Sequence, residues 1–147
     1  MTLRIHSGFC GGNIEVEAAS NSADLRLRLR PDQTADGSAG GPMQWFSFRL
    51  SGAEGQACSF RIVNAAQAAF PKGWEDYRVC ASDDGEHWFR VLTQVEKGEL
   101  RFQHTPRASA WFAYFVPYSL ERLWARIGHW QTSPRVQVQT LGASPDG

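Results

Sequence analysis

The chain has 147 residues, with 15 basic and 15 acidic side chains and therefore no net charge at neutral pH. This balance excludes a protein that binds nucleic acid or an anionic membrane through bulk charge. The hydrophobic content of 42% suits one packed domain and is too high for a disordered chain. No apolar run approaches the roughly 20 residues of a membrane helix, and the first residues lack a signal-peptide segment. We therefore expect neither a membrane nor a nucleic-acid partner.

Cysteines and histidines give no sign of a metal site. Cys10, Cys58 and Cys80 are odd in number and widely spaced, so we expect reduced thiols in a cytoplasmic protein. The four histidines lack the His-x-x-Glu or His-x-x-x-His spacing that places two ligands together. Phosphate-binding, dinucleotide-binding and serine-hydrolase motifs are also missing from the sequence. We assign no catalytic residue, metal ligand or cofactor to this chain.

Alternation of apolar and polar residues dominates most of the sequence and predicts β-strands. Leu25, Leu27 and Leu29 would face a core, and the arginines between them would face solvent. The expected strands are 13–18, 25–30, 44–50, 58–62, 77–82, 88–92, 99–103 and 111–116.

Turn-forming residues separate these strands. The stretch 31–42 is rich in Gly, Asp and Ser and predicts a polar loop, and tight hairpin turns are expected at 83–85 and 97–98. Many short strands at this spacing, without the rhythm of alternating strands and helices, predict a mainly β protein. The specific expectation is an antiparallel β-sandwich with one short C-terminal helix.

The helix follows the last predicted strand of the sandwich. Ser119 can cap it, and Leu120, Leu123, Trp124 and Ile127 have the spacing of one helical stripe. Gly128 and the nearby Pro134 are expected to end it. We place a β-sandwich domain at 1–128 and a linker with a further strand at 129–147.

The end of the chain suggests a strand that lacks its partner. Residues 135–141 read as a strand that runs into an Asp146-Gly147 turn, and no return strand follows. We expect the front part of a longer protein. The orphan strand would be loosely held, paired with the sandwich, or paired with a neighbouring copy in a homo-oligomer.

Two sets of outward side chains are candidates for binding. The same alternation points Trp45 and Phe112 outward and Phe115 toward the core, and exposed aromatic rings can stack on sugars or bases. Arginines form a larger outward set, which would make a basic face if the strands are neighbours. That face would either carry cross-strand Arg–Glu pairs or recognise an acidic partner. The set comprises Arg26, Arg28, Arg30, Arg49, Arg61 and Arg78.

Four segments together resemble one family. They are MQWFSFR at 43–49, NAAQAAFPKGWEDYR at 64–78, DDGEHWFRV at 83–91 and YFVPYSLER at 114–122. They are similar to the N-terminal domain of zinc carboxypeptidases of the cytosolic carboxypeptidase type. The resemblance implies an antiparallel β-sandwich that precedes a catalytic α/β domain.

The family's zinc ligands and catalytic glutamate lie in that later domain, and no position of this chain matches them. The resemblance therefore implies a non-catalytic accessory domain that supports folding of the peptidase domain and substrate access to it. Zinc is expected only in the absent catalytic domain. The implied partners are the downstream peptidase domain and, through the full enzyme, peptide or protein C-termini.

Residues expected at the domain interface or the substrate approach are Lys72, Trp74, Pro117, Tyr118, Ser119 and Arg122. Pro117 fixes the backbone before Tyr118, whose ring combines apolar area with a hydroxyl group. An ordinary buried tyrosine at a strand-to-helix corner is the alternative for this position. A stand-alone carbohydrate- or protein-binding sandwich that uses Trp45 is the alternative for the whole chain.

Overall fold

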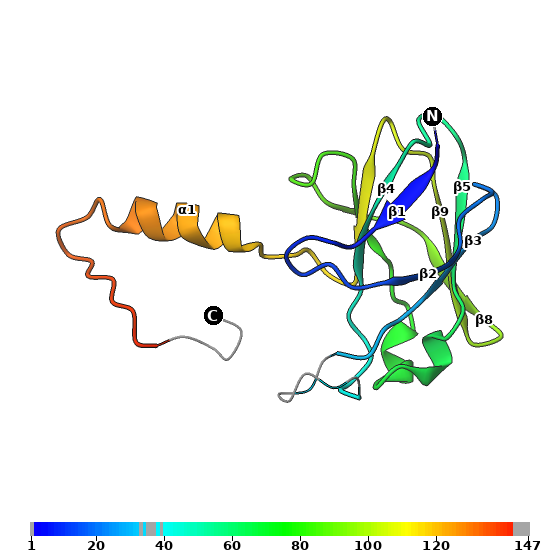
Figure 1. Ribbon diagram of the computed structural model, residues 1–147, viewed down its shortest axis with the longest axis horizontal. Helices are drawn as coiled ribbons and strands as arrows, with labels where there is room; N and C mark the ends of the chain where they lie inside the picture. Colours follow the sequence, from blue (N-terminus) through cyan, green and yellow to red (C-terminus); the bar gives the residue numbers. More distant parts are fainter. Residues whose placement is uncertain (1, 33, 35–37, 39, 143–147) are drawn as a thin grey trace.

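The computed structural model describes residues 2–32, 34, 38 and 40–142, which form two five-stranded sheets and one projecting helix (Figure 1). The first sheet has the order β1 (Arg4–His6), β4 (Ser47–Ser51), β10 (Ala110–Ala113), β6 (Cys80–Ser82) and β7 (Phe89–Arg90). The second sheet has the order β2 (Glu15–Ala18), β3 (Leu25–Arg28), β5 (Cys58–Ile62), β9 (Glu99–His104) and β8 (Thr93–Glu96). The predicted mainly β fold is confirmed.

Strand pairing departs from the expectation in one place. Every paired strand is antiparallel except β3 and β5, which run parallel because the chain crosses to the first sheet through β4 before it returns. Strands β1 and β8 were not predicted; β1 has only three residues, and β8 has four that are mostly exposed. The predicted turn at 97–98 does join β8 to β9, and both Lys97 and Gly98 have positive φ.

Phenylalanine side chains from both sheets fill the space between them. Phe60 and Phe102 of the second sheet stack with ring centroids 4.7 Å apart. Phe112 of the first sheet lies 4.7 Å from Phe60 and 5.1 Å from Phe48. The outward prediction for Phe112 is therefore wrong. The expected strand was too long: β10 ends at Ala113, so Phe115 lies beyond it and does not define the inward face.

Two short 3-10 turns, η1 (Ala65–Gln67) and η2 (Pro71–Trp74), close one end of the sandwich. Just before η1, the buried Asn64 side chain accepts a 2.8 Å hydrogen bond from the Leu29 N–H and donates a 3.1 Å bond to the Leu29 carbonyl oxygen. The side chain thus satisfies backbone groups where β3 has ended.

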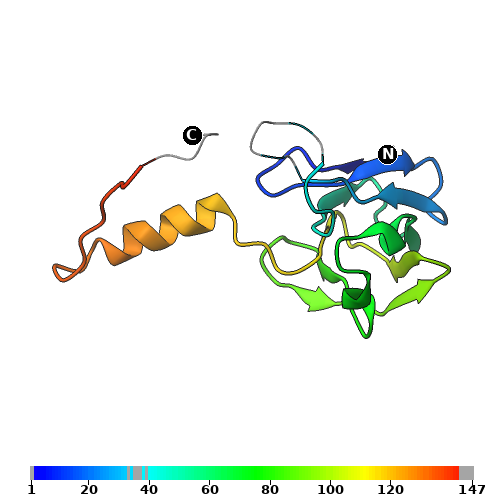
Figure 2. The same ribbon diagram turned by 90° about the horizontal axis from the view of Figure 1, so that it is seen from below.

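Helix α1 (Leu120–Trp130) extends away from the two sheets in both views, and the chain after it doubles back toward the sandwich (Figures 1 and 2). Ser119 caps the helix as predicted, but Gly128 lies inside it. The strand expected at 135–141 is wrong, because these residues form neither a strand nor a bridge. No described strand lies beside this segment to pair with its backbone. The expected Asp146-Gly147 turn lies outside the described residues.

Candidate interaction site at the connecting helix

The segment that leads to α1 leaves the sandwich through a cluster of aromatic rings. Tyr77 Oη donates a 2.6 Å hydrogen bond to the Tyr114 carbonyl oxygen, and burial raises the Tyr77 pKa, which keeps the hydroxyl protonated. The next ring, Phe115, lies 4.6 Å from Trp45, although more than half of Phe115 is exposed. Two consecutive residues are therefore held by the sandwich before the chain departs, which defines the direction of the connector.

The predicted residues from Pro117 to Arg122 come together at the first turn of α1. Ser119 Oγ accepts a 3.3 Å hydrogen bond from the Arg122 backbone N–H, and the Arg122 guanidinium lies 5.3 Å from the Tyr118 ring centroid. Tyr118 is half exposed, so the alternative of a buried corner tyrosine is wrong.

Helix α1 has an apolar stripe that is largely exposed. No residue of the helix is buried, and Leu120, Trp124 and Trp130 are 49%, 61% and 47% exposed. Leu123 and Ile127, which are partly buried, complete this stripe, and the Arg126 guanidinium lies 5.9 Å from the Trp130 ring centroid. An amphipathic helix normally buries such a stripe, so the exposure indicates an interaction surface.

A hollow of about 500 Å³ lies at the base of the helix. We call it the helix-base hollow. Five parts of the chain line it: the loop after β1, strand β4, the loop between β6 and β7, strand β10, and the connector with the first turn of α1. Its lining comprises Phe9, Cys10, Ser47, Gly85, Glu86, Trp88, Trp111, Pro117, Ser119 and Arg122. The sequence pointed only to the connector, because no local pattern links it to the other four parts.

Hydrogen bonds to Asp84 organise the loop that brings Glu86 and Trp88 to the hollow. The Asp84 carboxylate accepts a 2.7 Å bond from the His87 backbone N–H and a 2.8 Å bond from the Glu86 N–H. These bonds and the His87 ring lower the Asp84 pKa, and the carboxylate in turn raises the His87 pKa. The predicted tight hairpin is in fact a longer capped loop, residues 83–88.

The predicted pair in η2 lies elsewhere. Trp74 is only 3% exposed, and its indole N–H donates a 2.9 Å hydrogen bond to the Ala65 carbonyl oxygen, so it is a core residue. Lys72 is exposed on the same turn. Figures 1 and 2 show this turn, in green, apart from α1, and neither Lys72 nor Trp74 lines the hollow at the base of the helix.

The structure divides the predicted arginine set between different surfaces. Arg26 and Arg61 are register neighbours on the second sheet, and Arg101, which was not singled out from the sequence, follows on β9. Arg49 lies on the first sheet, where its guanidinium stacks 4.6 Å from the Trp111 ring. Arg30 and Arg78 lie outside the strands. The predicted single basic face therefore does not form.

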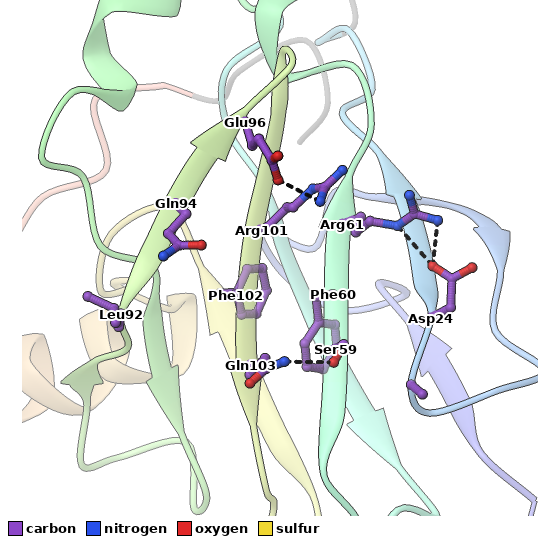
Figure 3. Close-up of a pocket in the computed structure, with 11 residues that line it drawn as sticks. Asp24, Ser59, Phe60, Arg61, Leu92, Gln94, Glu96, Arg101, Phe102 and Gln103 are labelled. Carbon is purple, nitrogen blue, oxygen red and sulfur yellow. Dashed lines mark hydrogen bonds and ion pairs between the residues drawn. The ribbon is translucent and has the colours of Figure 1, made fainter.

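Carboxylates balance the arginine row on the second sheet. Asp24 lies 2.6 Å from Arg61, and Glu96 lies 2.7 Å from Arg101 (Figure 3). Asp24 also lies 2.8 Å from Arg26. Elsewhere on this face, a carboxylate oxygen of Glu17 lies 3.4 Å from the Arg28 guanidinium. Directly opposed like charges are unfavourable in a sheet, and these acidic residues offset them. The face thus agrees with the alternative of cross-strand ion pairs.

Beside this row, the second sheet has a groove of about 430 Å³ (Figure 3). Gln94, Gln103 and Ser59 contribute polar groups, whereas its two aromatic lining residues, Phe60 and Phe102, are buried in the core. The candidate platform Trp45 is partly buried, donates its indole N–H to the Gly11 carbonyl oxygen at 2.7 Å, and packs on Phe115. These placements count against a sugar-stacking platform.

Within the described part of the chain, no group of three or more His, Cys, Asp or Glu side chains could hold a metal ion. None of the helices there is long and apolar enough to cross a membrane. Cys10 is exposed, Cys58 and Cys80 are buried, and all three are free thiols. Burial raises the pKa of Cys58 and Cys80.

Comparison with known families agrees with this architecture. The family model described as the cytosolic carboxypeptidase N-terminal domain matches residues 5–115, which include every strand except the start of β1. The chain belongs to this family. The match ends at Phe115, where the exposed connector begins.

Solved structures extend the similarity through the helix. A metallo-carboxypeptidase from Burkholderia cenocepacia has a TM-score of 0.88 and is 40% identical, over 96% of this chain and 36% of that protein. One from Pseudomonas aeruginosa has a TM-score of 0.80 and is 39% identical, over 88% of this chain and 34% of that protein. An uncharacterized protein from Zymomonas mobilis is 37% identical over the whole chain and 37% of its own length. The chain thus spans little more than a third of these relatives.

Proposed function

We propose that this chain is the non-catalytic N-terminal accessory domain of a longer zinc metallo-carboxypeptidase. The uncovered apolar stripe of α1 is the observation that supports this proposal most strongly. The sandwich buries its own core without the helix, so the stripe does not serve the fold of the sandwich. Similarity to carboxypeptidases nearly three times longer supplies a partner for it, the domain that follows in those proteins.

The proposed role is to hold and stabilise the peptidase domain and to shape substrate access. Burial of the stripe against that domain favours its folded state, because apolar area leaves water. Pro117, Tyr118 and Ser119 fix how the helix leaves the sandwich, and Arg122 lies at its base. Lys72 remains a candidate for a second contact on another side, and Trp74 acts only through the core beneath that turn.

Zinc has no place among the described residues, whose donors do not form a metal-binding group. In the proposed parent enzyme, zinc bound by the peptidase domain would polarise the scissile carbonyl and activate water at peptide or protein C-termini. The contribution that we propose for this chain is structural. Free thiols and the cytosolic family description support a cytoplasmic parent protein.

Two preparations test this proposal. The first is the 147-residue chain alone, assayed with added zinc against peptides that have free C-termini. The second is a chimera in which this chain replaces the matching N-terminal third of the Burkholderia cenocepacia protein. We expect no release of C-terminal residues by the chain alone, and release by the chimera that a chelator abolishes. Chelator-sensitive release by the clean isolated chain would overturn the proposal.

A further inference from the structure

We propose that the helix-base hollow binds a small zwitterionic ligand, namely a free α-amino acid or short peptide with an apolar side chain. Its volume of about 500 Å³ is within the range of roughly 300–1,000 Å³ that is typical of small-molecule sites. Three features of its lining support this ligand class. It has two unpaired charges of opposite sign and an aromatic wall whose rings are held by contacts within the protein. Its one helical residue, Arg122, lies on the other side of α1 from the apolar stripe.

Glu86 and Arg122 supply the charges. Both side chains line the hollow and are exposed, and within the described residues neither has an oppositely charged group within 4.0 Å. They also do not pair with each other, so space separates them. This differs from the second sheet, where Asp24 bridges Arg26 and Arg61. Unpaired charges of both signs around one hollow are complementary to a ligand that carries an ammonium and a carboxylate.

Trp88, Trp111 and Phe9 provide the apolar wall. The Trp88 indole N–H donates a 3.1 Å hydrogen bond to the Gly85 carbonyl oxygen, which holds the ring over its own loop. The Trp111 ring is held by the guanidinium of Arg49, 4.6 Å from its centroid. Because these rings are positioned without a ligand, binding would cost little side-chain entropy.

The hollow and the apolar stripe lie on different sides of α1. Arg122 is two residues from both Leu120 and Trp124, which is about 200° around the helix in each direction. A domain that packs on the stripe alone therefore leaves the Arg122 side of the helix free. Free amino acids are what a carboxypeptidase releases, although the lining supports this ligand class without that activity.

The test is a two-dimensional ¹H–¹⁵N NMR titration of the 147-residue chain with L-phenylalanine. We expect saturable shifts of the Trp88 and Trp111 indole signals. N-acetyl-L-phenylalanine lacks the ammonium and L-phenylalaninamide lacks the carboxylate, so each should bind about tenfold more weakly. Arg122→Gln should weaken phenylalanine binding about tenfold and abolish its advantage over the amide.

Glu86→Gln should likewise abolish the advantage of phenylalanine over its N-acetyl derivative. The matched control is Arg126→Gln, one turn further along the exposed helix and outside the hollow, which should leave the affinity unchanged. No saturable shift of the two indoles, equal binding of all three ligands, or an equal loss in Arg126→Gln would each overturn the proposal. None of these outcomes bears on the chimera assay, so the two proposals fail separately.

Discussion

Substitution of Trp124 tests most sharply whether the peptidase domain packs on the apolar stripe of α1. The side chain is 61% exposed on α1, and a tryptophan buries about 150–250 Å² when it is fully covered. Covering the exposed part would therefore remove about 90–150 Å² from water, which corresponds to about 2–4 kcal/mol. We expect Trp124→Ser to destabilise the chimera by this amount, because the replacement loses the buried area. Helix propensity changes little, since Ser and Trp rank close together.

The assay is urea unfolding of the chimera and of the isolated chain, each with and without Trp124→Ser. In the isolated chain we expect a change below about 0.5 kcal/mol, because the side chain is already in water. His129→Ser is the control, because His129 lies on the face of α1 opposite Leu120 and Ile127, and it should change neither protein by more than that amount. Equal effects of Trp124→Ser in both proteins, or none in the chimera, would refute the docking of this stripe.

Three further predictions concern the sandwich itself. Asn64→Ala should lower the free energy of unfolding by about 2–4 kcal/mol in urea, since both backbone groups of Leu29 lose their buried partner. Tyr77→Phe should cost about 1–2 kcal/mol in the same assay, because the Tyr114 carbonyl oxygen loses its donor at 2.6 Å. The pKa of Asp84 is lower in the folded protein than its unfolded value of about 4, so the ionised carboxylate stabilises the fold above that pH. This stabilisation is lost as the pH falls through the pKa of the folded state. The advantage of the wild type over Asp84→Asn in urea midpoint should therefore be present at pH 7 and shrink below about pH 4; an advantage that grows on acidification would contradict this cause.

Local chemistry predicted part of the fold. The turn at 97–98 and the cap at Ser119 depend on the conformational preferences of single residues, and both occur as expected. Strand β5 alternates strictly and matches its predicted bounds. The predicted bounds and inward face of β10 were wrong, because in the largely aromatic run from Trp111 to Phe115 either set of alternate residues could face the core. Only pairing with β4 decides that Phe112 points inward.

The sequence could not predict features that are formed by segments far apart in the chain. The arginine set could not be divided between two sheets before strand order was known, and its carboxylate partners come mostly from neighbouring strands and loops. The helix-base hollow is lined by five separate parts of the chain that share no sequence pattern. The strand expected at 135–141 had suitable composition, but a strand also requires a neighbour, and none of the described strands provides one.

Hydrogen exchange across α1 tests the central claim most directly. The measurement compares amide exchange in residues 120–130 of the isolated chain with exchange of the same residues in the chimera. The account predicts fast exchange in the isolated chain, where no residue of the helix is buried, and strong protection in the chimera, where the peptidase domain packs on the apolar stripe. Equal exchange in the two proteins would contradict the claim that this helix docks the domain onto its catalytic partner.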